Sequence, residues 1–212
     1  NNWPALMTQI APYLGNATSP SLVTSVMTYC GLTVADNGTI IASVSAACGA
    51  LFPALARVGV RAELALDSGN CSIAAYRALW SDVTVSPGVL LAAALSSNAS
   101  GVNIDLEPQA DNCQGQPTGT TADAALFATW LGAVRGVLNP HGIRLTVDTA
   151  TWSPVIGQYA VLAPSVDRVL TMETYNGDSE AQWLAWYDAF IGAVPRASAG
   201  VGLGAWSDGG GA

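Results

Sequence analysis

The run of residues 100–108 places three polar side chains at alternating positions. Its sequence is SGVNIDLEP, so Asn103, Asp105 and Glu107 recur at every second residue with hydrophobic residues between them. Side chains alternate between the two faces of a β-strand, so the polar groups share one face and the hydrophobic groups share the other. Two carboxyl groups near the end of a strand are suited to proton transfer at a bound substrate. Pro108 stops strand pairing just past them.

Strand-like segments alternate with helical segments on both sides of this run. The expected strands are 23–30, 61–69, 102–107, 144–149, 168–176 and 201–206, and helices are expected to begin near residues 3, 46, 72, 86, 121, 153 and 179. This alternation implies parallel strands with helices outside them. A doubly wound sheet would favour a Gly-rich phosphate-binding turn after the first strand, and none is visible, so we expect a barrel.

The run 100–108 resembles the Asp-Gly-x-Asp-x-Asp-x-Glu signature on the fourth strand of glycoside hydrolase family 18, the chitinase and endo-β-N-acetylglucosaminidase family. Asp105 and Glu107 match the last two acids of that signature. Ser100 and Asn103 stand where the signature has its first two aspartates. The match is therefore complete at the two acids nearest the strand end and altered before them.

A second resemblance lies at residues 173–176, Glu-Thr-Tyr-Asn. Family members commonly carry Met-x-Tyr-Asp or Met-x-Tyr-Asn there, on the sixth strand. Tyr175 and Asn176 match, and Glu173 replaces the methionine. By strand alternation Glu173 faces the same way as Tyr175, which would bring an additional acid near the site.

The resemblance implies an α/β fold, the (β/α)8 TIM barrel. Six strands are legible, whereas a closed barrel needs eight. Aligning the run 100–108 with the fourth strand leaves the first and eighth strands without a match. We therefore expect a single domain over residues 1–212 that is a fragment covering about strands 2 to 7, incomplete at both ends.

For activity, the resemblance implies a hydrolase of β-1,4-linked N-acetylglucosamine that retains configuration, acting on a chitin-like polymer or an N-glycan core. Glu107 would be the general acid, and Asp105 would orient the substrate's N-acetyl group, whose carbonyl oxygen attacks the anomeric carbon. Tyr175 would hydrogen-bond that carbonyl. Asn103 can form hydrogen bonds but cannot share a proton as an aspartate would, so weak or narrow-pH activity is expected.

Other residues near strand ends are candidates for sugar binding. Acid and amide groups can hydrogen-bond hydroxyls, and the flat face of a tryptophan can stack on a sugar ring. The candidate substrate-binding residues are Asn176, Glu173, Asp148, Trp152 and Trp206.

Two alternatives to this activity remain open. In the first, the chain is a catalytically weak or inactive glycan-binding or structural surface protein, which the residues at Ser100, Asn103 and Glu173 favour. In the second, Glu107-Pro108 resembles the acid/base Glu-Pro of other barrel glycosidases. Their nucleophile is a glutamate on the seventh strand. This chain has only Asp208 just beyond that strand, so Glu173 would have to serve as an unorthodox nucleophile.

Composition excludes several classes of site and partner. The net charge is −8, the seven basic residues are all arginine, and His141 is the single histidine. A Lys Schiff base, a P-loop lysine and a His-rich zinc site are therefore excluded, and nucleic acid is a poor partner. No uninterrupted apolar run of about 20 residues suggests a membrane span. We expect no cofactor and no metal, and an N-acetylglucosamine-containing oligo- or polysaccharide as partner, with oligomeric state open.

The cysteines and glycosylation motifs favour a secreted or extracellular location. Four cysteines allow three pairings, and the expected order of strands favours Cys30 with Cys48 and Cys71 with Cys113. Four Asn-x-Ser/Thr motifs within the first hundred residues are typical of a secreted or cell-surface glycoprotein. Their asparagines are Asn16, Asn37, Asn70 and Asn98.

We predict glycans on at least two of these four asparagines, because each lies in an expected loop or strand approach. Enzymatic deglycosylation of native material should then lower its mass. No mass change would contradict the secreted glycoprotein interpretation.

Overall fold

A parallel β-sheet organises the protein. The computed structural model describes residues 8, 11–13, 23–68, 72–108, 119–172 and 179–201. Within them the strands are β1 (Ser25–Val34), β2 (Ile40–Ala42), β3 (Arg61–Asp67), β4 (Gly101–Asp105), β5 (Arg144–Thr149), β6 (Arg168–Thr171) and β7 (Ala199–Val201). Their order is β2-β1-β3-β4-β5-β6-β7, with β1 and β3 to β7 parallel and β2 antiparallel to β1.

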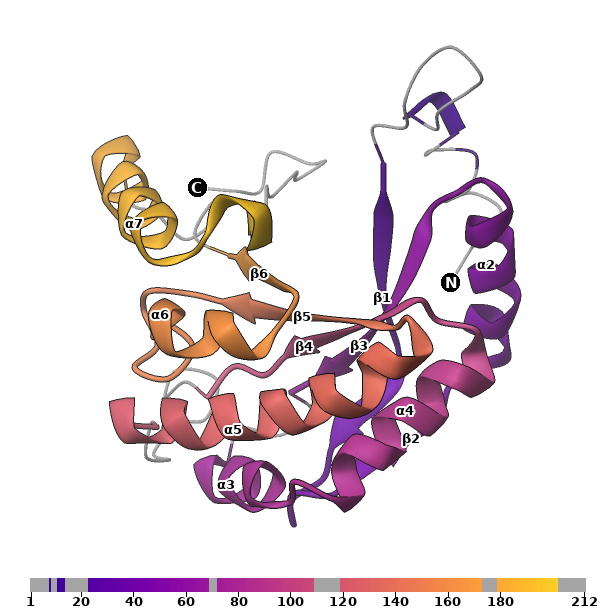
Figure 1. The fold of residues 1–212 in the computed structure, drawn as a ribbon, viewed down its shortest axis with the longest axis horizontal. Helices are drawn as coiled ribbons and strands as arrows, with labels where there is room; N and C mark the ends of the chain where they lie inside the picture. Colours follow the sequence, from indigo (N-terminus) through magenta and orange to yellow (C-terminus); the bar gives the residue numbers. More distant parts are fainter. Residues whose placement is uncertain are drawn as a thin grey trace.

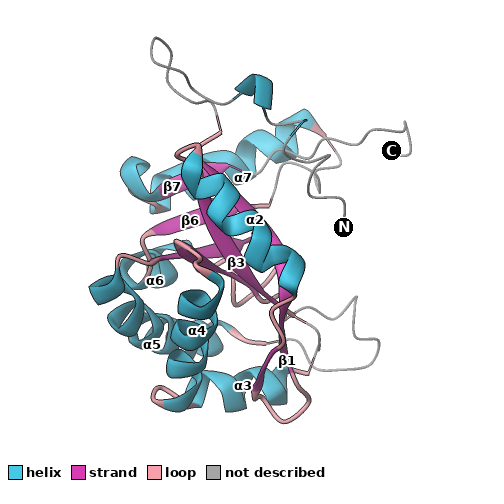
Figure 2. Cartoon of the chain, turned by 90° about the vertical axis from the view of Figure 1, so that its right-hand side faces the viewer, coloured by secondary structure: helices cyan, strands magenta, loops and turns pink. Residues whose placement is uncertain are grey.

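Helices cover the outer face of this sheet. They are α2 (Ala46–Arg57), α3 (Ile73–Ser81), α4 (Val85–Ser97), α5 (Thr121–Leu138), α6 (Tyr159–Leu162) and α7 (Glu180–Ala193), with short 3-10 turns at Ala11–Tyr13, Asn139–His141, Ala163–Ser165 and Arg196–Ser198. Figure 1 shows α3, α4 and α5 gathered along the sheet, with α2 and α7 toward its two ends. Figure 2 shows α4, α5 and α6 together on one side of the strands. The expected alternation of strands and outer helices is confirmed.

The core lies between the helices and the outer face of the strands. Trp80 and Phe127 stack with ring centroids 4.8 Å apart, and Phe127 stacks on Trp130 at 6.1 Å. The three rings are fully buried, as is Ile104 on the outer face of β4. Burial of this hydrophobic layer is what fixes the direction in which the polar face of β4 points.

A hairpin that the sequence pattern does not predict extends one edge of the sheet. Residues 36–38 form its turn, and β2 is its return strand. Gly38 has a φ of +81°, and a Cβ there would lie 2.5 Å from the carbonyl oxygen of Ala75 on α3. Because only glycine permits that approach, the hairpin tip packs directly against the helix.

The disulfide between Cys30 and Cys48 confirms one of the two predicted pairings and ties β1 to α2. The register between β1 and β3 shifts between Tyr29 and Leu32, so residues 30–31 form a bulge at the bridged position. Cys71 and Cys113, the second predicted pair, lie outside the described residues.

Two helices begin where the sequence predicts, and side chains fix both starts. α4 begins at Val85, where the carboxylate of Asp82 accepts hydrogen bonds from the backbone N–H groups of Val85 and Ser86. The side chain of Ser86 is used elsewhere and accepts a 2.9 Å hydrogen bond from the indole N–H of Trp130. The second helix, α5, is capped by Thr120.

The helix predicted to begin near residue 153 does not begin there. Residues 151–157 form turns, and α6 has only four residues. The hydroxyl of Ser153 accepts from the backbone N–H groups of Val155 and Ile156, at 3.3 Å each, as the side chain of a helix N-cap does. The N–H of Gly157 bonds to the carbonyl of Ser153 at 3.0 Å, but α6 begins only at Tyr159.

Among the described residues, no single helix has both the length and the apolar composition to cross a bilayer. The pair α3 and α4, bent by 88°, passes that test only when the two helices are taken together.

We predict that Asp123→Ala destabilises the protein by about 1–3 kcal/mol at pH 7. Asp123 accepts hydrogen bonds from Arg77 Nε at 2.7 Å and from the backbone and hydroxyl of Thr120, at 2.7 and 2.9 Å. These contacts, Arg77 first, hold the pKa of Asp123 well below its usual range. The stability they contribute is therefore present above about pH 4 and lost as the pH falls below it.

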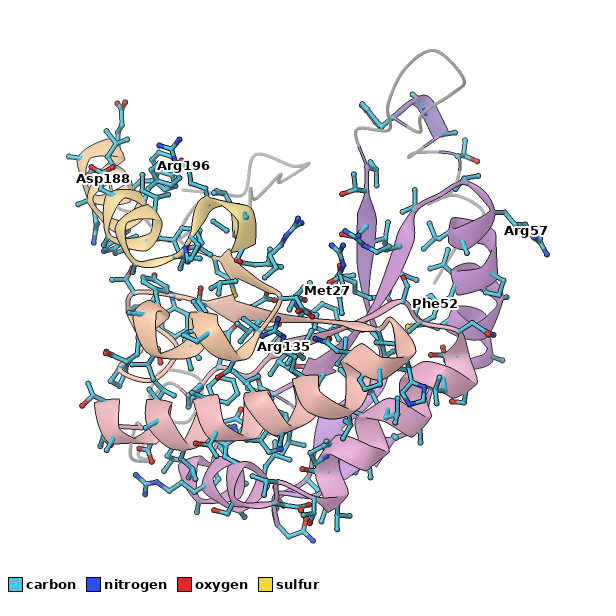
Figure 3. The ribbon with its side chains drawn as sticks, in the orientation of Figure 1. Met27, Phe52, Arg57, Arg135, Asp188 and Arg196 are labelled. Carbon is cyan, nitrogen blue, oxygen red and sulfur yellow. A yellow bond between two sulfur atoms is a disulfide. The ribbon has the colours of Figure 1, made fainter. Side chains whose placement is uncertain are left out.

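Urea denaturation at pH 7 and pH 3 measures both effects. Asp188→Ala, at an exposed position on α7 labelled in Figure 3, is the matched control. Equal loss of stability in the two variants would contradict the assignment.

Candidate active site

The inner face of the sheet carries polar residues that lie beside one another on neighbouring strands. Parallel pairing places Asp67 beside Asp105 and Asn103 beside Thr146. In the next pair, Asp148 lies beside Leu170. Because parallel strands end at the same edge, the polar row of β4 continues sideways onto β3 and β5. The predicted common face for Asn103 and Asp105 therefore extends over three strands.

A pocket of about 330 Å³ opens on this face toward the carboxyl ends of the strands. In Figure 3 the labelled side chain of Met27 points from β1 toward β5 and β6, across the pocket. Among the described residues the lining is Met27, Tyr29, Asp105, Glu107, Asp148, Leu170, Thr171, Met172 and Val201. The pocket is thus lined by three carboxyl groups, those of Asp105, Glu107 and Asp148, and by hydrophobic side chains.

The amide of Asn103 is fully buried and fixed by two hydrogen bonds. Its Nδ2 donates to Thr146 Oγ1 and to Asp148 Oδ1, each at 3.0 Å. Thr146 in turn donates to the carboxylate of Glu63 at 2.9 Å. Glu63 packs over Gly101, where a Cβ would come within 2.8 Å of Glu63 Cγ. The result is a continuous polar chain from β3 through β5 and β4 to the pocket.

Asp105 is held by a residue that the sequence pattern does not indicate. The phenol of Tyr29 on β1 donates to Asp105 Oδ2 at 2.5 Å. Burial raises the pKa of Asp105, the Tyr29 hydrogen bond lowers it, and the charge of Asp67 raises it further. Burial also raises the pKa of Tyr29, as do its hydrogen bond to Asp105 and the surrounding acids, so the phenol stays protonated.

Glu107 lies just past β4 and is half-buried at the pocket. The hydroxyl of Ser68 bridges the two strands: it donates to the carbonyl of Asp105 and accepts from the backbone N–H of Glu107, at 3.2 Å each. Burial, then the charges of Asp105 and Asp67, raise the pKa of Glu107 to about 7. A carboxyl group with this pKa is a competent general acid near neutral pH.

The third carboxyl of the pocket, Asp148, is 5% exposed. Its pKa is raised to about 7, mainly by burial and then by the charge of Asp105, although the hydrogen bond from Asn103 opposes the rise. The site therefore contains two acids that titrate near neutrality, placed around Asp105.

Of the remaining predicted site residues, only Trp152 lies among the described residues. Glu173, Tyr175, Asn176 and Trp206 lie outside the described residues. Trp152 is partly buried and packs against the hydrophobic core, and it does not line the pocket as described. The described residues offer no group of three His, Cys, Asp or Glu side chains arranged to hold a metal ion.

The site residues missed from the sequence are Tyr29, Met27, Thr146 and Glu63. Strand alternation was the sequence pattern that could have indicated them: Met27 and Tyr29 are two residues apart on β1, and Thr146 and Asp148 are two residues apart on β5. Alternation shows which residues of one strand share a face, but it does not determine the register between neighbouring strands.

Comparison with known proteins gives structural similarity and no sequence match. No family model matches the chain, and no curated protein sequence matches it. A chitinase from Chromobacterium violaceum superposes with a TM-score of 0.72 and 17% identity, over 94% of this chain and 64% of that one. The spore cortex-lytic enzyme SleL of Bacillus cereus gives 0.70 and 15%, over 96% and 46%.

The Group IV chitinase of Ostrinia furnacalis, solved in complex with allosamidin, gives a TM-score of 0.67 at 18% identity, over 85% of this chain and 57% of that one. At these identities the similarity establishes the fold. The chain therefore has the α/β fold of the chitinase TIM barrels, as the resemblance to family 18 predicted. It spans less than two thirds of the length of each of these three solved chains.

We predict that Asp148→Asn stabilises the protein as the pH rises. An amide keeps the shape of Asp148 and an oxygen for the Asn103 Nδ2 group. The folded-state pKa is about 7, whereas an unfolded aspartate titrates near about 4. Ionisation of Asp148 therefore costs the wild-type folded state stability between these two values.

Urea denaturation should show a gain on the order of 1–3 kcal/mol at pH 8 and little difference at pH 4. Asp188→Asn at its exposed position serves as the control and should show no such trend. A pH-independent difference in Asp148→Asn would contradict the raised pKa.

Proposed function

We propose that this protein is a glycoside hydrolase that cleaves β-1,4-linked N-acetylglucosamine in a chitin-like polymer or N-glycan core. One observation carries the proposal: Asp105 at the end of β4 and Glu107 just past it both line the pocket at the carboxyl ends of the parallel strands. In TIM-barrel enzymes that end of the strands is where chemistry occurs. The shared fold with chitinases supports the same reaction class.

Glu107 acts as the general acid in this proposal. Its raised pKa keeps the carboxyl protonated below about pH 7, so that it can donate a proton to the glycosidic oxygen. Activity should therefore fall as the pH rises through about 7, since the donor form of Glu107 is then lost.

Asp105 orients the substrate in this proposal and does not act as the nucleophile of a two-carboxylate mechanism. A nucleophile must approach the anomeric carbon from the face opposite the acid, and Asp105, the last residue of β4, lies only two residues before Glu107. The substrate's own N-acetyl oxygen attacks instead, with Asp105 accepting from the amide N–H and retention of configuration as the result. Tyr175 completes this arrangement by the family resemblance.

The substrate class is supported by the names of the structural neighbours, several of which are chitinases. The partly hydrophobic lining from Met27, Leu170 and Met172 suits the apolar face of a sugar and its methyl group. A secreted or cell-surface location belongs to the same proposal. It is supported by the Cys30–Cys48 bridge and the four glycosylation motifs.

A second candidate is a glycan-binding protein with weak or no catalysis. Two changed signature positions favour it. Ser100 Oγ accepts from the backbone N–H of Ala62 at 3.0 Å, and thus joins β4 to β3. The Asn103 amide is committed to Thr146 and Asp148. Neither position supplies a carboxyl to the site.

Glu107→Gln distinguishes the two candidates. Glutamine preserves the shape of the side chain but cannot donate the catalytic proton, so kcat on labelled chito-oligosaccharides should fall by roughly 10²–10⁴ with binding little changed. Glu180→Gln, at an exposed position opening α7, should match the wild-type protein.

Undiminished turnover in Glu107→Gln would defeat the assignment, as would efficient cleavage of glycosides that lack the N-acetyl group. Binding of chito-oligosaccharides by a wild-type protein without turnover would favour the glycan-binding alternative.

A further inference from the structure

The Asn103 amide cannot donate a hydrogen bond to Asp105, because both of its N–H groups already donate to other residues. A carboxamide carries two N–H bonds, and the structure directs both to acceptors, Thr146 Oγ1 and Asp148 Oδ1. The hydroxyl of Thr146 donates onward to Glu63, so it must accept from Asn103. The remaining atom of the amide, Oδ1, is an acceptor and cannot bond to an ionised Asp105.

Asp105 therefore requires a donor from another strand. Tyr29 provides it through the 2.5 Å hydrogen bond to Oδ2, a length typical of a charge-assisted O–H···O⁻ bond. The other carboxylate oxygen, Oδ1, is buried and has no hydrogen-bond partner among the described residues. An unsatisfied buried acceptor in a ligand pocket is the atom to which a ligand donor would bind.

We propose that Tyr29 is a positioning residue for Asp105: its phenol anchors Oδ2, which leaves Oδ1 to accept the N–H of the substrate's N-acetyl group. This inference rests on the proposed function for the identity of the ligand. The hydrogen bond from Tyr29 stands without it.

The placement of Tyr29 follows from the regular register of the strands. Tyr29 pairs with Ala65 of β3, and Ala65 pairs with Asn103 of β4, so Tyr29 lies on the same inner face as Asn103 and Asp105. The side chain of Tyr29 is half-exposed at the pocket, next to the lining residue Met27.

The position also keeps the proton on the phenol. The acids that face Tyr29 are Asp105, Asp148 and Asp67, on β4, β5 and β3, and their negative charge opposes ionisation of the phenol. Glu107 shares the same pocket. Tyr29 is thus a donor over the working range of the other groups, and Asp105 is the acceptor.

Tyr29→Phe tests the inference, since it removes the hydroxyl and keeps the ring. In the full protein, the Asp105 carboxyl is followed by carbon-13 NMR during a pH titration, and its pKa should rise because the hydrogen bond to the charged form is lost. Tyr187→Phe on α7 should leave that titration unchanged. An unchanged titration in Tyr29→Phe would overturn the inference.

Steady-state kinetics provide a second test of the role of Tyr29. With chito-oligosaccharides, kcat of Tyr29→Phe should fall about 10- to 100-fold, the effect of losing one hydrogen bond to a charged group, and KM should change little. A kcat equal to that of wild type overturns the positioning role. If the wild-type protein hydrolyses nothing, the proposed function fails, and the titration alone then supports or overturns the role of Tyr29.

Discussion

Bringing carboxyl groups together away from water is costly, and the inner face of this sheet does so at Asp105, Asp148 and Glu107. The fold tolerates the cost because the opposite face of the same strands is buried. Val102, Ile104 and Leu106 are at most 1% exposed beneath the outer helices. A one-residue slip of β4 would exchange these faces, so the hydrophobic layer holds the acids where they are.

Because the signature on β4 is altered, residues of neighbouring strands supply polar groups that the family signature would supply from β4. Where the family signature has aspartates, this chain has a serine that joins two strands and an asparagine that joins β4 to β5. The carboxyl that meets the Asn103 amide, Asp148, comes from the neighbouring strand. A tyrosine of β1 supplies the donor for Asp105. Polar groups from three further strands thus surround the two matched acids.

The sequence predicted the parts of the site that depend on one strand. Alternation placed Asn103 and Asp105 on one face, and the order of strands predicted the Cys30–Cys48 pair. It did not predict Tyr29, whose partner Asp105 is 76 residues away. That contact depends on the register of β1, β3 and β4, which arises from pairing between strands.

The same distinction holds in the helices. The starts of α2 and α3 followed from local propensity and capping residues. The turns after β5 did not: Ser153 makes the contacts of a helix N-cap, but the turn that it begins ends at Gly157 and α6 begins only at Tyr159.

The inner face also separates charge along the strand axis. Arg61, Arg144 and Arg168 lie together at the amino ends of β3, β5 and β6 with two acids, Glu63 and Asp167, which leaves a net positive charge there. The acids that line the pocket are at the carboxyl ends, and no basic side chain is among its described lining residues. This arrangement is a permanent dipole whose negative end faces the pocket opening. Its field draws hydronium ions toward the pocket and repels polyanions, so the acids experience a local pH below that of the surrounding solution.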